Sequence, residues 1–302
     1  MHHARRWTRR RPFWYDAVMS GIALPRLPAR TPDAHKGDCG RVLVVAGSRG
    51  MTGAAALCAS AAVRGGAGLV TCATPRECYP IVAAHLMEAL FAPMPQTAAG
   101  TLAPAAARLL RERAAQCGVV ALGPGLSTDP GTARCVAAFL HRLGRPCVID
   151  ADGLNLLAQQ PCLVCRTGAP VVITPHPGEM ARLAGLTTAQ VQADREGVAR
   201  RFAKDFGCVV VLKGRGTVVT DGARVRVNRT GNPGMATGGS GDVLTGLIAA
   251  LIGQGLTALD AAILGAHVHG LAGDRAAKAR GGTIGLAASD LLACLPAALR
   301  SV

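Results

Sequence analysis

The chain has 302 residues, of which half are apolar and only 3% aromatic, and its formal net charge is +15. This length is enough for one large α/β domain or two small ones with a sizeable buried core. A positive charge of this size would suggest nucleic-acid binding, but the arginines are scattered and the one basic cluster, residues 5–11, precedes the expected fold. The charge fits a small polyanionic ligand equally well, and we expect no nucleic-acid partner.

The cysteines and the apolar runs narrow the class of protein further. Eleven cysteines are dispersed along the chain, mostly in apolar stretches, which is typical of reduced, buried thiols in a cytosolic protein. Cys162 and Cys165 form a C-x-x-C pair without a second pair or a nearby histidine, so coincidence is favoured over zinc or redox chemistry. The longest uncharged run, residues 243–259, is broken by Gly-Gln-Gly and is short for a membrane span. No signal peptide is convincing, and we expect a cytoplasmic protein without a membrane partner.

Residues 1–34 differ from the rest of the chain. They contain both tryptophans and prolines at positions 12, 25, 28 and 32, which favours a leader that is either disordered or packed as an arm. A transit peptide is the less favoured interpretation of its arginines. Residues 35–302 show no repeat, no low-complexity linker and no change of composition, so a single domain is expected there.

Strand-like and helix-like segments alternate from residue 41 onward. Short apolar runs predict strands at residues 42–46, 69–73, 88–91, 119–122, 147–150, 171–174, 208–213, 217–220 and 224–228. Helical patterns cover residues 54–63, 80–85, 103–115, 131–142, a short stretch from 154, 178–184, 188–206, 241–253, 258–278 and 287–299. This alternation predicts a three-layer α/β/α fold with a mostly parallel central sheet, and Asp221-Gly222 predicts a hairpin near its end.

Five of the predicted strands end in polar or glycine-rich segments. These segments are residues 47–53, 123–127, 150–155, 174–179 and 213–217. Ligands of parallel α/β sheets bind beyond the carboxyl ends of the strands. One such exit is expected by chance, whereas five on one edge predict a binding site there.

The most informative stretch is residues 230–242, which reads Thr-Gly-Asn-Pro-Gly-Met-Ala-Thr-Gly-Gly-Ser-Gly-Asp. Five glycines and a proline predict a tight loop, and the apolar run after it predicts a helix. Unpaired N–H groups at a helix start attract anions. We therefore expect an anion hole at Gly238, Gly239, Ser240 and Gly241, with Asp242 in or beside the first helical turn. An ordinary glycine-rich turn before a core helix is the alternative.

Carboxylates after the strand at residues 147–150 suggest further contacts. Asp150 and Asp152 are suited to hold Mg²⁺ or a ribose, although Asp152 as a helix cap is the simpler alternative. Asn155 could satisfy nearby backbone groups. No metal ligand set is assigned from these residues.

Two other exits carry candidate ligand contacts. His176 lies between two prolines that fix its backbone, so a ligand contact is favoured over a core position, while Glu179 could contact ligand or merely occupy a first helical turn. Residues 213–217 form a short cationic loop suited to nucleotide phosphates, or else a solvated turn. His267 and His269 lie in a helical stretch rich in alanine and glycine, and we assign them no role.

Together these parts predict phosphoryl transfer to an alcohol. Backbone N–H groups would hold the phosphate, and Asp242 would accept the proton of the attacking hydroxyl as a general base. The chain contains no G-x-x-x-x-G-K-[ST] motif, so it is not a P-loop enzyme.

From about residue 35 to its end, the chain resembles the ADP-dependent NAD(P)H-hydrate dehydratases of the ribokinase-like superfamily. The segments that carry the resemblance are residues 35–37, 47–55, 65–68, 123–126, 150–155, 174–179, Lys213-Gly214 with Thr217, and 231–242. The G-x-G-D sequence alone would indicate only the superfamily, whereas all of these segments in order are highly specific.

The resemblance implies a repair reaction on the S epimer of NAD(P)H hydrate (NADHX or NADPHX). ADP, or ATP, would phosphorylate its 6-hydroxyl, and loss of phosphate would restore NADH or NADPH. By the same resemblance Asp242 is the base and a substrate contact. The other implied contacts are Ala54, Gly125 and His176 for the hydrate, and Lys213, Gly214, Arg215, Gly216, Thr217 and Gly241 for the adenine nucleotide, with Asn232 as a further candidate.

The resemblance also implies Mg²⁺ and a homo-oligomer, a tetramer being common among stand-alone members. Many bacterial relatives carry an epimerase domain ahead of the dehydratase, and 34 leading residues are too few for one. We therefore expect a separate NAD(P)H-hydrate epimerase in the pathway. Two other functions stay open from the residues: a ribokinase-like small-molecule kinase that keeps its phosphorylated product, and a non-catalytic adenine-nucleotide sensor.

Overall fold

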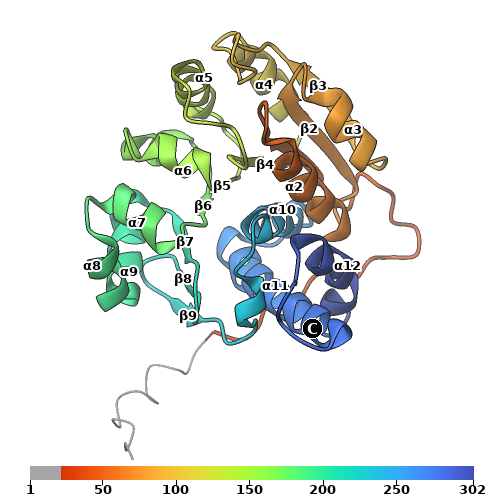
Figure 1. Ribbon diagram of the computed structural model, residues 1–302, viewed down its shortest axis with the longest axis vertical. Helices are drawn as coiled ribbons and strands as arrows, with labels where there is room; N and C mark the ends of the chain where they lie inside the picture. Colours follow the sequence, from red (N-terminus) through yellow and green to blue (C-terminus); the bar gives the residue numbers. More distant parts are fainter. Residues whose placement is uncertain (1–21) are drawn as a thin grey trace, which may run out of the picture.

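The computed structural model describes residues 22–302, and residues 1–21 lie outside the described part. Its centre is one nine-stranded sheet with the order β3-β2-β1-β4-β5-β6-β7-β8-β9 (Figure 1). The strands are β1 (Arg41–Val45), β2 (Leu69–Pro75), β3 (Leu90–Met94), β4 (Val119–Leu122), β5 (Cys147–Ile149), β6 (Val171–Ile173), β7 (Val209–Leu212), β8 (Val218–Thr220) and β9 (Val225–Val227). The predicted α/β class with a mostly parallel sheet is confirmed.

Neighbouring strands are parallel from β3 across the sheet to β7, and β7, β8 and β9 are paired antiparallel. A parallel connection needs a crossover of a dozen or more residues, and the linkers 213–217 and 221–224 are too short for one. In the second linker the Asp221 carboxylate accepts hydrogen bonds from the N–H groups of Ala223 and Arg224. The hairpin predicted at Asp221-Gly222 is therefore present.

Helices cover both faces of the sheet. They are α2 (Thr52–Arg64), α3 (Tyr79–His85), α4 (Ala106–Ala114), α5 (Pro130–Leu140), α6 (Asp152–Leu157), α7 (Pro177–Ala184), α8 (Thr188–Ala193), α9 (Arg195–Phe206), α10 (Ser240–Gly253), α11 (Ala258–Arg280) and α12 (Ala288–Leu299), with short 3₁₀ helices η1 (Pro161–Arg166) and η2 (Pro233–Met235). Figure 1 shows α2, α10, α11 and α12 on one side of the strands and α5 to α9 on the other.

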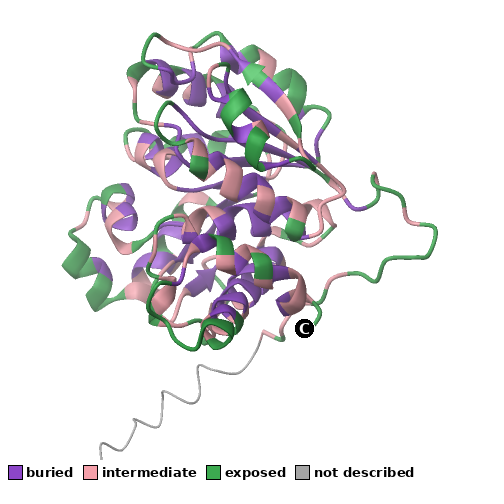
Figure 2. Cartoon of the chain, turned by 45° about the vertical axis from the view of Figure 1, so that its right-hand side comes forward, coloured by how far each residue is buried: buried purple, intermediate pink, exposed green. Residues whose placement is uncertain are grey.

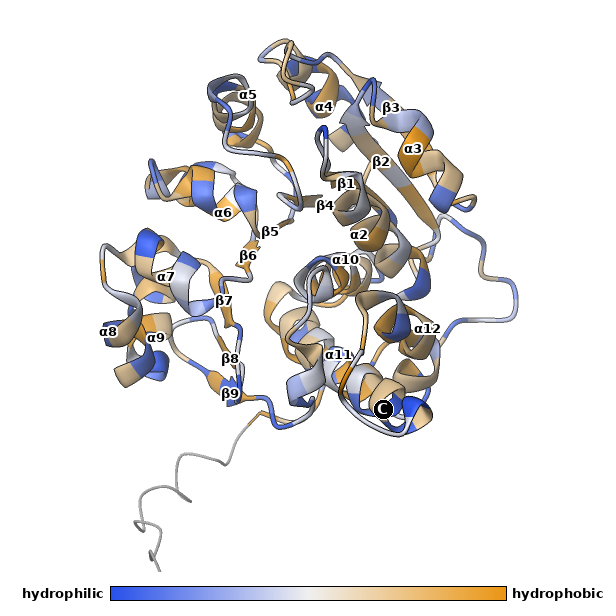
Figure 3. Cartoon of the chain, viewed as in Figure 1, coloured by the Kyte–Doolittle hydropathy of each residue, from blue (hydrophilic) through white to orange (hydrophobic). Residues whose placement is uncertain are grey.

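Each face has its own hydrophobic core, because side chains alternate along a strand. In β1, Val42 and Val44 belong to the core beneath α2, α10, α11 and α12, whereas Leu43 and Val45 belong to the opposite core. All four side chains are fully buried, and the strands form the buried centre of Figure 2. In Figure 3 the hydrophilic residues lie mainly on the outer helices and loops, as expected for a sheet covered on both faces.

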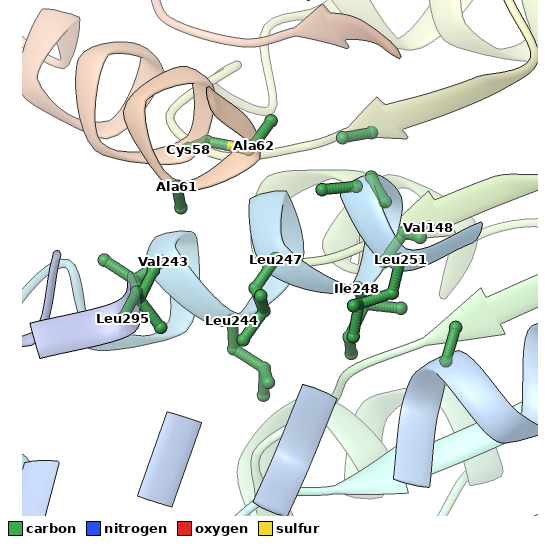
Figure 4. Close-up of a cluster of buried hydrophobic side chains, with 14 of the residues drawn as sticks. Cys58, Ala61, Ala62, Val148, Val243, Leu244, Leu247, Ile248, Leu251 and Leu295 are labelled. Atoms are coloured by element: carbon green, nitrogen blue, oxygen red, sulfur yellow. The ribbon is translucent and has the colours of Figure 1, made fainter. Parts of the chain in front are cut away.

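Small residues let α10 lie close to α2. A Cβ atom added to Gly246 would stand 2.0 Å from the carbonyl oxygen of Cys58, so only glycine fits at this crossing. Figure 4 shows Cys58 and Ala61 of α2 facing α10, whose larger side chains Leu247 and Ile248 fill the core. This close packing fixes the position of α10, and with it the loop that precedes α10.

Residues 22–40 contain no helix or strand, but part of this segment packs on the domain. Ile22, Leu24 and Leu27 contact the core beneath α2, α10, α11 and α12, and Arg226 of β9 donates a hydrogen bond to the carbonyl of Ile22. The division into a leader of residues 1–34 and a domain of residues 35–302 stays a prediction. Among the described helices, none combines the length and the apolar character that crossing a bilayer requires.

The predicted helix at residues 188–206 is wrong in one respect, because the structure divides it into α8 and α9. Asp194, at the junction, has φ −140° and ψ 63°, which is not helical. Its carboxylate accepts a hydrogen bond from the N–H of Gly197 and so caps α9. The apolar periodicity continues across the junction, which explains why the break was not predicted. The structure also adds η1, on which both cysteines of the C-x-x-C pair are exposed.

Candidate active site at the carboxyl edge of the sheet

Three of the strand exits meet at the start of α10. Lys213, after β7, places its Nζ 2.6 Å from Oδ1 of Asp150, after β5, and 3.7 Å from Oε2 of Glu179 in α7. Thr245 of α10 donates a hydrogen bond to Oδ2 of Asp150 at 2.7 Å. A Cβ atom added to Gly241 would lie 3.3 Å from both Asp150 and Lys213, so the first turn of α10 lies directly beside this ion pair. The predicted convergence of loops at one edge is therefore present.

The charges of this cluster perturb one another. Burial by itself would raise the pKa of Asp150, but the Lys213 ammonium and hydrogen bonds from Lys213 and Thr245 outweigh burial and hold that pKa below its usual value. Burial by itself would lower the pKa of Lys213, but the carboxylates of Asp150 and Glu179 outweigh burial and raise that pKa above its usual value. Both groups are thus charged at neutral pH, and they form a buried ion pair.

Asp242 is in the first turn of α10, as predicted. Its pKa is raised to about 7, first by burial and then by the negative charge of Asp150, while Lys213 acts in the opposite direction. A carboxylate with a pKa near neutrality is able both to accept and to return a proton at physiological pH, which is the property required of a general base.

The glycine-rich loop, residues 230–239, leads into α10, and no side chain caps the start of this helix. Gly239 occupies the N-cap position of α10 with φ +86°, and no side chain accepts a hydrogen bond there. The first N–H groups of a helix have no partner within it. Among the described residues, the N–H groups of Thr237, Gly238, Gly239, Gly241 and Asp242 also bond to no backbone carbonyl. Ser240 differs from the prediction, because its N–H donates to the carbonyl of Thr237 at 3.4 Å and so is not a free donor of the anion hole. Unpaired N–H groups at the positive end of α10 are suited to hold a phosphate.

His176 and Glu179 cap the start of α7. Nδ1 of His176 accepts hydrogen bonds from the N–H groups of Gly178 and Glu179, and the Glu179 carboxylate accepts one from the N–H of His176 at 2.7 Å. The two side chains form a capping box, a structural role that the sequence did not predict for either residue, although Glu179 does occupy the first helical turn, as its alternative stated. The His176 ring is half-exposed, and its contact with a ligand stays a prediction.

Asp152 and Asn155 connect strand exits to one another. Oδ2 of Asp152 accepts a hydrogen bond from the N–H of Ser127 at 2.8 Å, and Asn155 donates to Oδ1 of Asp152. Arg182 of α7 in turn donates to Oδ1 of Asn155. The N-cap of α6 is Ala151, so the alternative that Asp152 caps this helix is wrong. These side chains align the loops after β4, β5 and β6.

Ala54 and Gly125 lie side by side where the strand order reverses, between β1 and β4. A Cβ atom on Gly125 would come within 3.0 Å of the Ala54 Cβ, and φ of Gly125 is +62°. The Ser48 hydroxyl donates to the carbonyl of Gly125 at 2.8 Å and fastens the two loops together. Such a reversal is where open α/β sheets bind ligands, and the substrate contacts of Ala54 and Gly125 stay predictions.

Arg195 of α9 holds the loop of residues 213–217 through hydrogen bonds to backbone carbonyls. Its guanidinium donates to the carbonyls of Leu212 and Lys213 at 3.0 and 3.2 Å. Arg215 is exposed, and Gly214 and Gly216 have positive φ. The Lys213 side chain points to Asp150 rather than to solvent, so a phosphate contact of this loop would involve its backbone and Arg215.

The described residues contain no group of three or more His, Cys, Asp or Glu side chains placed to hold a metal ion. Both oxygens of Asp150 are bonded, to Lys213 and Thr245, and those of Asp152 to Ser127 and Asn155. Mg²⁺ is commonly held by one or two carboxylates together with substrate phosphates. The protein side chains alone therefore do not form a magnesium site, and no metal ligand is assigned.

A three-layer α/β/α fold in which a glycine-rich loop precedes a helix that carries a carboxylate is that of the ribokinase-like proteins. The structure is similar to a ribokinase-like superfamily protein from Enterococcus faecalis, with a TM-score of 0.76, 27% identity and coverage of 91% of this chain and 92% of that one. It is equally similar to the ADP/ATP-dependent NAD(P)H-hydrate dehydratase from Bacillus subtilis co-crystallized with ATP/Mg²⁺ (TM-score 0.76, 29% identity, 91% and 94% covered).

The chain belongs to the NAD(P)H-hydrate dehydratase family, whose model matches residues 42–297. It is 50% identical over 279 residues to the bifunctional NAD(P)H-hydrate repair enzyme Nnr of Moorella thermoacetica, covering 92% of this chain and 52% of that protein. It is 39% identical over 267 residues to the ADP-dependent (S)-NAD(P)H-hydrate dehydratase of Neisseria meningitidis, covering 87% and 86%. The chain thus spans about half the length of the bifunctional relative and most of the length of the other.

Several residues of the site were not predicted from the sequence. Thr245 follows Asp242 by three positions and Arg195 begins a different helix, so neither belongs to a strand exit. Asp274 and His269 of α11 bond to the glycine-rich loop. A polar side chain in a helix rich in alanine and glycine is the only signal that the sequence offers for either residue, and it assigns no role to His269.

Proposed function

We propose that this chain catalyses the ADP-dependent dehydration of the S epimer of NAD(P)H hydrate. The observation that carries the proposal is the position of Asp242, with a pKa near 7, in the first turn of an uncapped helix that follows the glycine-rich loop. The printed names of the Neisseria and Bacillus relatives support the choice of substrate and nucleotide.

In the first step the 6-hydroxyl of the hydrate is phosphorylated. Asp242 accepts the hydroxyl proton while the oxygen attacks the terminal phosphorus of the nucleotide, so that ADP leaves as AMP. The N–H groups around Gly238, Gly239 and Gly241 stabilise the charge on the transferred phosphoryl group. These donors are fixed before the ligand arrives, so little reorganisation is needed during the reaction.

In the second step the bond between C6 and the phosphate oxygen breaks, C5 loses a proton to water, and the new double bond between C5 and C6 restores NADH or NADPH. The same N–H groups stabilise the departing phosphate, because its negative charge increases as the carbon–oxygen bond breaks. The Asp150–Lys213 pair lies beside Gly241 and keeps a cation close to the carboxylates of this edge. Without that cation, like charges would raise the pKa of Asp242 further and reduce the fraction that is able to act as a base.

The proposed ligand contacts form two groups, one for the adenine nucleotide and one for the hydrate. The proposed contacts of the adenine nucleotide are Lys213, Gly214, Arg215, Gly216, Thr217 and Gly241. Ala54, Gly125 and His176 are proposed for the hydrate. Ala54 and Gly125 are adjacent at the reversal of strand order, which is compatible with one shared pocket. A magnesium ion bound to the nucleotide phosphates, a cytoplasmic location, a homotetramer and a separate epimerase partner belong to the same proposal.

The decisive experiment is turnover of NADHX with ADP and with ATP in parallel reactions. We expect recovery of the near-ultraviolet absorbance of NADH together with release of inorganic phosphate. A kinase that retains its product would consume nucleotide without releasing phosphate, and a nucleotide sensor would bind nucleotide without any turnover. Either result would overturn the proposal, and comparing the two nucleotides identifies the preferred donor.

A further inference from the structure

The glycine-rich loop lies along one face of α11 and is bonded to that helix at both ends. Near the start of the loop, the Thr230 hydroxyl donates to the carbonyl of His267 at 2.8 Å, and Asn228 donates to the carbonyl of Ala266 at 3.1 Å. The α11 residues that contact the loop, 266, 267, 269, 270, 273 and 274, recur at the three- and four-residue spacing of a helix face. One helix therefore holds the loop at residues 230–235 and again at Ser240.

Asp274 uses both of its carboxylate oxygens to order the first half of the loop. Oδ2 accepts a hydrogen bond from the N–H of Gly231 at 2.9 Å, and Oδ1 accepts one from Nδ2 of Asn232 at 3.0 Å. Asn232 in turn accepts a hydrogen bond from the N–H of Gly234 and caps η2. The position of η2 therefore depends on a carboxylate of α11.

His269 holds the opposite end of the loop. Its Nε2 lies 2.9 Å from the carbonyl oxygen of Ser240, the first residue of α10, and the imidazole is buried. Burial lowers the pKa of His269 to about 4, so the ring is neutral at pH 7. A neutral ring that donates from Nε2 carries its only ring proton there, which assigns its tautomer.

The first half of the loop also packs closely against α11. A Cβ atom on Gly270 would stand 2.1 Å from the Thr230 hydroxyl, and one on Gly273 would stand 2.2 Å from the sulfur of Met235. The loop therefore rests directly on the backbone of α11. Residues 237–239, between η2 and α10, keep N–H groups that bond to no backbone carbonyl of the described chain.

We propose that α11 is the positioning element of the anion loop, in which Asp274, through Asn232, and His269 set the spacing of the N–H groups that bind the nucleotide phosphates. Neither Asp274 nor His269 is placed on the reacting atoms. The proposal rests on the proposed function, because it requires a nucleotide phosphate at this loop. A displacement of about 1 Å in such a site costs about 10²-fold in rate, so loss of either attachment has a measurable effect.

Exchange of the Asn232–Asp274 pair tests the proposal. In Asp274→Asn the one remaining side-chain oxygen of residue 274 accepts from the N–H of Gly231. Its new NH₂ group then faces the NH₂ group of Asn232, so the hydrogen bond from Asn232 is lost. The double variant Asn232→Asp/Asp274→Asn restores this bond with donor and acceptor reversed, and still leaves acceptors for the N–H groups of Gly231 and Gly234. Asp260→Asn is the matched control, because Asp260 is also on α11 but bonds only to its own cap, Thr257.

The readouts are calorimetric binding of ADP and ATP, kcat and KM with NADHX, and thermal unfolding of each variant. We expect Asp274→Asn to weaken nucleotide binding about tenfold, equivalent to 1.4 kcal/mol, and the double variant to recover most of that loss. Removal of a negative charge would by Coulomb attraction alone strengthen binding of an anion, so the two explanations predict opposite signs. Asp260→Asn should bind nucleotide as the wild type does.

The proposal is overturned if Asp274→Asn binds nucleotide as tightly as Asp260→Asn does. It is also overturned if the folded double variant binds no better than Asp274→Asn. If the wild type binds ADP but does not turn over NADHX, the proposed function fails, while the binding comparison still decides the role of α11. If the wild type binds neither nucleotide, both proposals fail.

Discussion

Helices α7 and α10 both begin at the carboxyl edge of the sheet, but their first turns are built in opposite ways. The start of α7 is closed by His176, whose ring accepts two backbone hydrogen bonds, and by the returning carboxylate of Glu179. The start of α10 has Gly239 in a left-handed conformation and no side-chain acceptor. A Pro-Gly pair marks both starts, as Pro177-Gly178 in the first turn of α7 and as Pro233-Gly234 ahead of α10, so both sequences signal a helix start.

The difference shows which helix terminus is able to take an anion. A capping box uses the N–H donors that a phosphate would need, whereas a glycine at the N-cap leaves them exposed. The α7 terminus therefore contributes a carboxylate, Glu179, to the charge cluster, and the α10 terminus contributes donors. Five variants or conditions test this division of roles, and they follow from the largest expected effect to the smallest.

Asp242→Asn removes the proposed base from the α10 terminus and leaves the N–H donors in place. We expect kcat for NADHX to fall by about 10²–10⁴-fold while the affinity for ADP is kept, since general-base catalysis contributes about that much. Steady-state kinetics and calorimetry measure the two quantities. Asp205→Asn on the exposed surface of α9 is the control. Unchanged kcat in Asp242→Asn would exclude it as the base.

Lys213→Met tests the ion pair that connects the two helix starts. The change leaves the Asp150 carboxylate buried without its cation, and we expect the free energy of unfolding to fall by about 3–5 kcal/mol. The double variant Asp150→Asn/Lys213→Met should recover part of this loss. Denaturant titration measures both, and an equal loss in the single and double variants would contradict a coupled pair.

The dependence of the rate on pH reports the state of Asp242. Because the carboxylate form is the base and its pKa is about 7, kcat/KM should rise with pH below 7 and level off above it. The pKa is higher in the folded chain than the usual 3.8, so the folded state binds this proton more tightly. Stability of the wild type relative to Asp242→Asn should therefore decrease as pH rises from about 4 through about 7. A pH-independent difference would contradict the assignment.

Gly239→Ala tests the backbone geometry that keeps the α10 terminus uncapped. With φ +86°, alanine is strained by about 1–2 kcal/mol, and its Cβ would lie 2.4 Å from the Leu57 side chain. Gly238→Ala is the matched control for stability, since no atom lies within 4 Å of its added Cβ. Thermal unfolding should separate the two variants, and equal midpoints would argue against strain at Gly239.

His176→Ala opens the α7 terminus and should cost about 1 kcal/mol of stability, the usual value of a cap. Thr187→Ala removes the equivalent capping box of α8, away from the site, and provides the comparison. If His176 also contacts the hydrate, only His176→Ala will raise KM for NADHX. Identical kinetics in the two variants would leave His176 with its capping role alone.

Much of the fold could be predicted because the information is local. Apolar runs such as Val42–Ala46 and Val171–Thr174 are long enough for buried strands, and the helices between them require parallel neighbours. The break at Asp194 was missed because its periodicity suits one helix as well as two. In the same way, residues 230–242 predict a glycine-rich loop followed by a helix with Asp242 in its first turn, since their glycines specify a turn wherever it lies in the fold.

The sequence by itself determined the fold class, the family and the edge of the sheet where the candidate site lies, because these depend on periodicity, turn residues and motif order. Only the tertiary structure decided how the charged side chains are used. Lys213 pairs with Asp150, His176 caps α7, and Asp274 and His269 hold the glycine-rich loop against α11. These partners are distant in the sequence and meet only after the sheet and its helices have packed, so no local pattern specifies them.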